Sequence, residues 1–153
     1  MQFCLSVSLT NPQLLVSRMI KYENKYVKIE LDDALNALVH TWRGFAKGRE
    51  YREAWEESLK LAKKHNIKHW LINQRDLKGI STEDLRWTNE EWVPKSNQEI
   101  GAQRFTAIVL SENIFDEVAL KKSATSLKEE GIVAGYFAKE EFAKQWLADS
   151  EQQ

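Results

Sequence analysis

Residues 69–94 decide the fold, and they read HWLINQRDLKGISTEDLRWTNEEWVP. The first four residues, His69–Ile72, form an apolar run that is too short for a surface helix, so we predict a buried strand there. The polar residues from Asn73 to Gly79 predict a loop. A strand followed by a polar connection and a helix is the unit in which α/β domains usually place their working surface.

The helix after this loop has a recognisable start. Ser81 stands three residues before Asp84, which is the spacing of a capping box, so Thr82 is expected to be the first helical residue. Glu83 adds a negative charge at the end of the helix where the dipole favours one. The hydroxyls at this helix start are thus expected to act first as caps.

Two tryptophans in this helix are expected to have different surroundings. Leu85 and Trp92 are seven residues apart, so we expect them to share a face that packs on the sheet. Trp87 falls on roughly the opposite side, where burial under a loop and exposure to solvent remain open alternatives. Pro94 is expected to end the regular structure.

The rest of the chain alternates between strand and helix patterns. Alternating apolar residues in 26–31 and again in 37–42 predict an antiparallel hairpin, and spacings of three and four predict a helix over 48–65. Downstream we expect a strand, a helix, a strand and a closing helix, over 104–110, 111–128, 132–137 and 139–149. This order predicts an α/β fold: a single-layer mixed sheet, antiparallel in the N-terminal hairpin and parallel in the later strands, packed with about four helices.

Length, net charge and cysteine content limit the classes of protein to which this chain can belong. A chain of 153 residues has the length of one domain, and we expect it to span 19–149, with 1–18 as an N-terminal extension and 150–153 as a tail. A strand within 1–18 that pairs with the sheet is the alternative. A net charge of −1 gives no electrostatic footprint for nucleic acid or an anionic membrane, and no stretch has the length of a membrane span. Cys4 is the only cysteine, which excludes an intrachain disulfide and predicts a cytoplasmic protein.

The element order and the unit at 70–92 resemble the STAS domains of sulfate transporters and anti-sigma-factor antagonists. In that family a D-S-x-G motif begins the helix after a buried strand, and its serine is a phosphorylation switch for partner binding. Set beside the motif, Ser81 takes the aspartate position, Thr82 the serine and Asp84 the glycine. The resemblance implies Thr82 or Ser81 as a phospho-acceptor, although the aspartate and the glycine of the motif are replaced and Glu83 and Asp84 would repel a phosphate.

The chain is also similar to small uncharacterised bacterial proteins labelled STAS-like or grouped with the CRAL-TRIO lipid-binding proteins. The similarity covers roughly 20–147 and includes a tyrosine-rich first hairpin that leads into the first of three motifs. It is carried by W-x-G-F at 42–45, N-x-R at 73–75 and W-x-x-x-x-W-x-P at 87–94. It implies a STAS-like fold and brings no assigned chemistry.

We therefore expect a non-enzymatic, STAS-like regulatory module that works through protein contacts or self-association. The expected interaction surface consists of polar residues and one aromatic anchor around the helix start: Arg75, Asp76, Ser81, Thr82, Asp84 and Trp87.

A carrier or sensor of an apolar small molecule or lipid is the alternative function. The large aromatic residues could wall a pocket between the sheet and the first helix: Trp42, Phe45, Tyr51, Trp55, Trp70 and Trp92. Open volume between sheet and helices would favour this alternative, whereas a filled core with an exposed Trp87 would favour the interaction module.

Neither a metal site nor an enzyme is expected. The spacing of His40, His65 and His69 places no three ligands at one point. Asp76, Glu83 and Asp84 lack an accompanying nucleophile, oxyanion-hole motif or phosphate-binding loop. We therefore expect no metal, cofactor or catalytic residue.

Overall fold

The computed structural model describes residues 18–101, 104–111, 128 and 131–150. Six strands form one sheet in the order in which they occur along the chain: β1 (Arg18–Glu23), β2 (Val27–Asp32), β3 (Ala37–Ala46), β4 (His69–Ile80), β5 (Arg104–Val109) and β6 (Ile132–Phe137). The pairs β1–β2 and β2–β3 are antiparallel, and the pairs from β3 to β6 are parallel. The predicted α/β class, with an antiparallel N-terminal part and parallel later strands, is confirmed.

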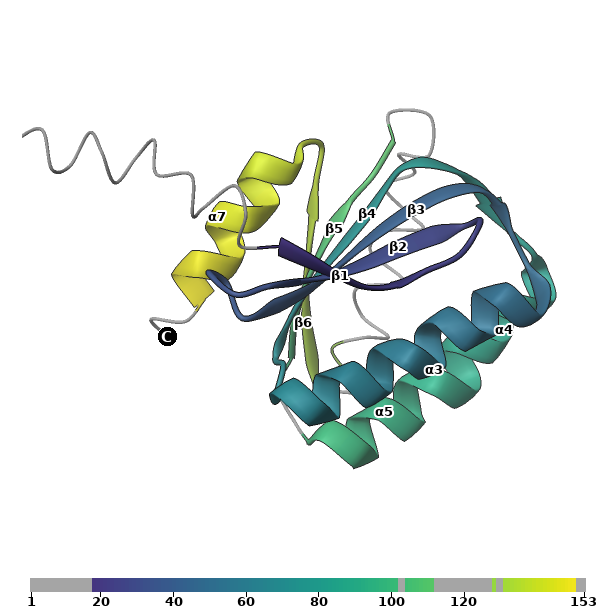
Figure 1. Cartoon of the computed structure of the whole chain (residues 1–153), viewed down its shortest axis with the longest axis horizontal. Helices are drawn as coiled ribbons and strands as arrows, with labels where there is room; N and C mark the ends of the chain where they lie inside the picture. Colours follow the sequence, from purple (N-terminus) through teal and green to yellow (C-terminus); the bar gives the residue numbers. More distant parts are fainter. Residues whose placement is uncertain (1–17, 102–103, 112–127, 129–130, 151–153) are drawn as a thin grey trace, which may run out of the picture.

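Helices cover both faces of this sheet (Figure 1). On one face α3 (Gly48–His65) lies beside a second helical run, which consists of α4 (Thr82–Trp87), the π-helical turn η1 (Thr88–Trp92) and α5 (Val93–Ile100). On the other face α7 (Glu140–Ser150) packs on β4, β5 and β6. None of the helices in the described ranges is long and apolar enough to cross a membrane.

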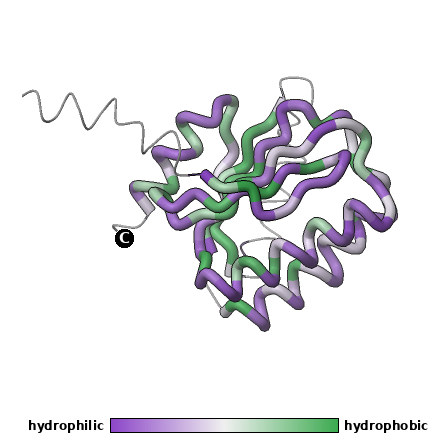
Figure 2. Tube along the Cα trace, in the orientation of Figure 1, coloured by the Kyte–Doolittle hydropathy of each residue, from purple (hydrophilic) through white to green (hydrophobic). Residues whose placement is uncertain are grey.

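The two faces have separate apolar cores. The larger core lies under α3 and α5 and includes Ile29, Leu38, Trp42 and Trp70, all of them buried. The smaller core lies under α7 and includes Val39, Leu71, Val109 and Leu147. Alternate residues of the strands thus enter opposite cores, as the pleat requires. In Figure 2 the central strands carry much of the hydrophobic colour, while α3 and α5 alternate between hydrophilic and hydrophobic residues.

The sheet is larger than the sequence pattern predicts. β1 has no predicted counterpart, because only two of its six residues are even half-buried and it shows no apolar alternation. The loop predicted from Asn73 to Gly79 is wrong, because this segment is the second half of β4. It is a strand because β3 continues to Ala46 and provides its hydrogen-bonding partner, with Arg43 opposite Asp76 and Ala46 opposite Ile80.

Pro94 does not end the regular structure. It lies in the first turn of α5, directly after the π-helical turn, and the helical run continues through it. The helix over 48–65 is found where it is predicted, and Asn66 follows it in the left-handed conformation. The strands at 104–109 and 132–137 and the closing helix are confirmed within one residue or two. Of the helix predicted over 111–128, residues 112–127 lie outside the described residues, and Lys128 is helical.

Candidate functional site

A cavity of about 470 Å³ lies between the sheet and the helices α3, α4, η1 and α5. Its lining is mostly aliphatic and aromatic, and the described residues that form it are Tyr51, Trp55, Trp70, Ile72, Gln74, Leu77, Gly79, Ile80, Leu85, Thr88, Asn89, Trp92, Val93, Arg104, Thr106, Ile108, Leu110, Ile132 and Tyr136. This volume is within the range of about 300–1,000 Å³ that is usual for small-molecule sites.

The floor of the cavity is made by alternate residues of the last two strands. Thr106 and Ile108 of β5 face it, as do Ile132 and Tyr136 of β6. The intervening residues of β5, such as Ala107, enter the smaller core under α7. The alternation of the strand therefore assigns one face of β5 to the cavity and the other to the protein core.

β4 reaches the cavity twice because it contains an irregularity. Trp70, Ile72 and Gln74 line it at a spacing of two, and the next lining residue of the strand, Leu77, is three positions further on. The pairing with β3 shifts in this interval. The extra residue reverses the alternation, so both halves of the strand present side chains to the same cavity.

Aromatic rings form another part of the wall of the cavity. The rings of Trp55 and Trp92 are 4.7 Å apart, and those of Trp70 and Trp92 are 5.8 Å apart with their planes at 79°. The indole N–H of Trp92 donates a hydrogen bond to the carbonyl of Trp55 at 2.9 Å, which ties η1 to α3. Rings that are held in this way offer a pre-formed apolar surface.

A small number of polar groups interrupt this apolar lining. Arg104 is 3% exposed, and its guanidinium carbon lies 5.6 Å from the ring centre of Trp70 and 5.7 Å from that of Trp92. The Trp70 indole nitrogen and the Tyr136 hydroxyl are both buried, and neither has a hydrogen-bond partner among the described residues. The cavity thus combines aromatic walls with hydrogen-bond donors.

Four of the six aromatic residues predicted to wall a pocket line this cavity: Tyr51, Trp55, Trp70 and Trp92. Trp42 does not, because it is buried beneath Trp55, whose ring stacks on it at 5.7 Å. Phe45 does not either, because the pairing of β3 and β4 shifts beside it and its ring lies 51% exposed next to Gly79.

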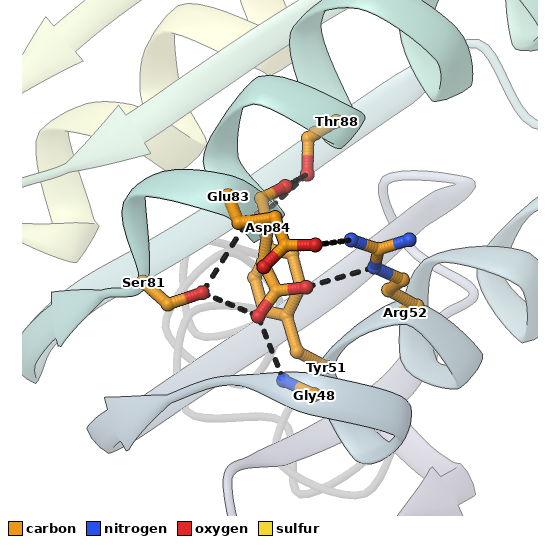
Figure 3. Close-up of polar contacts among 7 residues, drawn as sticks. All are labelled: Gly48, Tyr51, Arg52, Ser81, Glu83, Asp84 and Thr88. Atoms are coloured by element: carbon orange, nitrogen blue, oxygen red, sulfur yellow. Dashed lines mark hydrogen bonds and ion pairs between the residues drawn. The ribbon is translucent and has the colours of Figure 1, made fainter.

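A polar network fixes the start of α4 at one end of the cavity (Figure 3). The Asp84 carboxylate accepts hydrogen bonds from the Gly48 backbone amide at 2.7 Å, from Arg52 Nε at 2.8 Å and from the Ser81 hydroxyl. Thr88 donates to the Asp84 carbonyl at 3.1 Å, and its hydroxyl is also bonded to that of Tyr51 at 2.7 Å. The Thr88 hydroxyl has only one proton, so Tyr51 is the donor in this second bond.

The network keeps Asp84 ionised. Burial raises the pKa of the Asp84 carboxyl, but hydrogen bonds from Ser81, the Gly48 amide and Arg52 outweigh burial and hold the pKa below its usual value. Arg52 also lies over the Trp87 ring, 5.2 Å from its centre.

The structure places the predicted interaction residues in different environments. Arg75, Asp76 and Thr82 are exposed, Ser81 and Trp87 are half-buried, and Asp84 is buried. The Ser81 hydroxyl also accepts a hydrogen bond from the Asp84 amide at 3.2 Å, which is the predicted cap. Leu85 does not share the burial of Trp92, since it is 43% exposed at the solvent side of the cavity. The π-helical turn between them changes the angular spacing on which the prediction depended.

The histidines do not converge. In the described ranges no group of three or more His, Cys, Asp and Glu residues could hold a metal ion. His40 is fully buried, and its Nε2 lies 2.8 Å from the Ser58 hydroxyl, which donates to the Ala54 carbonyl. Burial lowers the pKa of His40 to about 3, so this ring is neutral and structural.

Among the cavity residues that sequence reasoning did not propose are Arg104 and Tyr136, which bring polar groups to the apolar lining. Both lie in strands that it predicted, and both share a strand face with apolar lining residues at a spacing of two or four. The signal in the sequence was an arginine on the same face of the predicted strand as Thr106 and Ile108, at a spacing of two residues.

Comparisons with known proteins address the fold. No family model matches the sequence, and no curated protein matches it. Among solved structures, a crystal structure of an uncharacterized protein of the DUF3478 family with a SpoIIAA-like fold, from Shewanella loihica PV-4, is similar with a TM-score of 0.52. The two chains are 18% identical, and the match covers 83% of this chain and 98% of the other. This chain has a SpoIIAA-like fold.

The SpoIIAA-like fold confirms the STAS-like architecture that the sequence motifs implied. At this identity the likeness carries no activity, because one fold hosts many functions.

Proposed function

We propose that this protein is a non-enzymatic, cytoplasmic carrier or sensor that binds an apolar small molecule in the cavity between the sheet and α3–α5. The observation that carries the proposal is the open, aromatic-lined volume of about 470 Å³ between the sheet and the helices. The walls are built from both helices and strands and are tied together by hydrogen bonds, as in pre-formed ligand sites.

The composition of the lining supports binding rather than catalysis. Arg104 is the one charged side chain among the described residues that line the cavity, so no pair of general acid and base faces it from these residues. Apolar side chains and three tryptophans make up most of the surface, which suits a ligand whose binding is driven by removal of apolar area from water.

The experiment uses a neutral apolar dye, N-phenyl-1-naphthylamine, whose fluorescence rises when it leaves water. We expect saturable binding to the wild type with quenching of tryptophan emission, because Trp55, Trp70 and Trp92 line the site. Native mass spectrometry of the protein as purified will detect a retained ligand.

A matched pair of substitutions locates the site. Ile108→Trp fills the cavity and should weaken dye binding by about tenfold or more. Val133→Trp adds the same side chain at a 45% exposed position of the neighbouring strand that does not line the cavity, and should leave binding unchanged. Circular dichroism checks that both variants fold. Equal binding by wild type and Ile108→Trp would overturn the proposal.

A protein-interaction role is the second candidate, and a different observation favours it. Phe45 and Leu85 are 51% and 43% exposed at the same end of the molecule as the exposed Thr82 hydroxyl. Exposed apolar side chains beside a modifiable hydroxyl suit a phosphorylation-responsive contact. A Thr82→Glu variant that gains or loses a partner in cross-linking of the expressing cells, relative to Thr82→Val, would support this role.

A further inference from the structure

We propose that Thr106 determines the specificity of the cavity, and that the ligand is an apolar molecule with a neutral carbonyl group that accepts a hydrogen bond from the Thr106 hydroxyl. This inference rests on the proposed function and specifies the chemical class of the ligand. Its basis is the position of one hydroxyl on the floor of the cavity.

Thr106 lies on the middle strand of the cavity floor. Strand pairing places it between Trp70 of β4 and Ala134 of β6. Neighbouring strands are about 4.8 Å apart, so these three side chains are adjacent on the same face of the sheet. An indole can only donate a hydrogen bond and an alanine side chain can do neither, so neither neighbour accepts the hydroxyl proton of Thr106. The next residue of β5 that lines the cavity, Ile108, is aliphatic.

Among the hydroxyl groups of the described lining, that of Thr106 is the one left to bind a ligand. The hydroxyls of Tyr51 and Thr88 are bonded to each other at 2.7 Å, and Thr88 also donates to the Asp84 carbonyl. The hydroxyl oxygen of Tyr136 is itself buried. Thr106 is half-buried and lines the cavity, and its side chain makes no hydrogen bond with the described residues.

An unpaired hydroxyl proton affects which ligands bind. Solvent that enters an open cavity can accept such a proton. A ligand with apolar surface alone would displace the solvent and leave the Thr106 hydroxyl without an acceptor, which weakens binding by about tenfold. An acceptor oxygen of the ligand at the same place avoids this loss. The floor therefore favours a ligand with an acceptor over a hydrocarbon of the same shape.

A neutral carbonyl is the acceptor that suits this position. The Thr106 hydroxyl is neutral, so it cannot compensate for the removal of a charged group from water. A ligand hydroxyl would bring a second proton, and two paired hydroxyls leave one proton without an acceptor. A carbonyl oxygen accepts a hydrogen bond and brings no proton of its own, so one bond satisfies the donor.

The test uses two naphthalenes that differ in one group. 2-Acetylnaphthalene has a carbonyl where 2-ethylnaphthalene has a methylene. Equilibrium dialysis against the full chain measures the dissociation constant of each compound below its solubility limit. The hydrocarbon gains more free energy on leaving water, so the wild-type constants alone do not isolate the hydrogen bond. The deciding quantity is the ratio of the two constants, compared between the wild type and Thr106→Val.

Thr106→Val replaces the hydroxyl by a methyl group of similar size. We expect it to weaken binding of 2-acetylnaphthalene and not that of 2-ethylnaphthalene, so that the ratio changes by about tenfold. Thr106→Ser keeps the hydroxyl and should keep the wild-type ratio. Thr41→Val is the matched control, because Thr41 is half-buried in β3 and is not one of the residues that line the cavity. It should change neither constant.

The outcomes separate this inference from the proposed function. The same ratio in wild type and Thr106→Val would overturn the role of Thr106 while apolar binding survives. Binding of N-phenyl-1-naphthylamine without binding of 2-acetylnaphthalene would have the same meaning. If neither the dye nor any naphthalene binds, both proposals fall. Should circular dichroism show that Thr106→Val does not fold, Thr106→Ala, which also lacks the hydroxyl, takes its place in the ratio.

Discussion

Asp84 accepts a hydrogen bond at 2.7 Å from the backbone amide of Gly48, a residue 36 positions earlier in the chain. Lys47, the residue before α3, makes no side-chain cap of its own, so this carboxylate serves as the cap of α3 while it belongs to α4. One buried side chain therefore joins the starts of the two helices that frame the cavity.

Replacement of Asp84 by Asn should lower the free energy of unfolding by about 2 kcal/mol, because the ion pair with Arg52 is lost and an amide nitrogen faces the Gly48 N–H. Urea denaturation measures this change. Glu83→Gln is the matched control: Glu83 is 89% exposed and lies 4.0 Å from Arg52, so its effect should stay within about 0.5 kcal/mol. Equal effects of the two substitutions would contradict the assigned role.

The same carboxylate should contribute to acid sensitivity. The pKa of Asp84 is lower in the folded protein than in the unfolded chain, so its stabilisation is present above the unfolded pKa. It is lost as the pH falls through the folded value. Asp84→Asn removes this contribution, so the difference in stability between wild type and variant should shrink as the pH falls below the ordinary carboxyl range. A difference that stays constant with pH in urea titrations would show that ionisation of Asp84 is not what stabilises the helix starts.

The hydroxyl pair of Tyr51 and Thr88 supports the cavity from the side of the helices. Thr88→Val keeps the shape but leaves the Tyr51 hydroxyl without its 2.7 Å partner, and should cost about 1–2 kcal/mol in thermal or chemical unfolding. Thr88→Ser keeps the hydroxyl and should cost less than half as much. A double-mutant cycle with Tyr51→Phe isolates the pair, and a coupling energy of zero would mean that the two hydroxyls act independently.

The strand and helix pattern was readable because most elements bury a periodic apolar face. Val27, Ile29 and Leu31 alternate on β2 and all enter the larger core, which is why the hairpin could be placed. β1 was not predicted because it is held by backbone pairing with β2 and buries no periodic apolar face that the sequence could show. The second half of β4 was missed for the same reason, since its polar residues are held by the extension of β3.

The site was only partly predictable for a different reason. Trp55, Trp70 and Trp92 could be proposed as pocket residues from their size and spacing. Whether Trp42 fills the core or borders open volume depends on how α3 sits on the sheet, which local sequence does not determine. Arg104 lies in a run that reads as a buried strand, and only the arrangement of β4, β5 and η1 places it among tryptophans.

Acid should destabilise the protein through the buried imidazole of His40 as well. Burial lowers its pKa from 6.5 to about 3, so the unfolded chain binds a proton that the folded protein does not. Stability should therefore fall as the pH drops below 6.5, by about 1.4 kcal/mol per pH unit from this group once the unfolded residue is protonated. Unfolding free energies measured from neutral pH to about pH 5 should show a shallower slope for His40→Leu. Leu59→Ala, which removes a buried side chain of α3 and keeps His40, should lower stability at every pH without changing the slope.

Trp87 distinguishes the two candidate functions. Its ring is half-buried and held by Arg52 at 5.2 Å, so Trp87→Ala should lower the free energy of unfolding by about 1 kcal/mol through the lost cation–π contact and packing. Trp87→Phe keeps a ring for Arg52 and should lose less than half of this. Because the ring serves an intramolecular contact, we expect light scattering and native mass spectrometry to give the same oligomeric state for wild type and Trp87→Ala. A wild-type dimer that becomes a monomer in Trp87→Ala, while Trp87→Phe remains a dimer, would instead make this helix an interaction surface and weaken the case for the cavity as the working site.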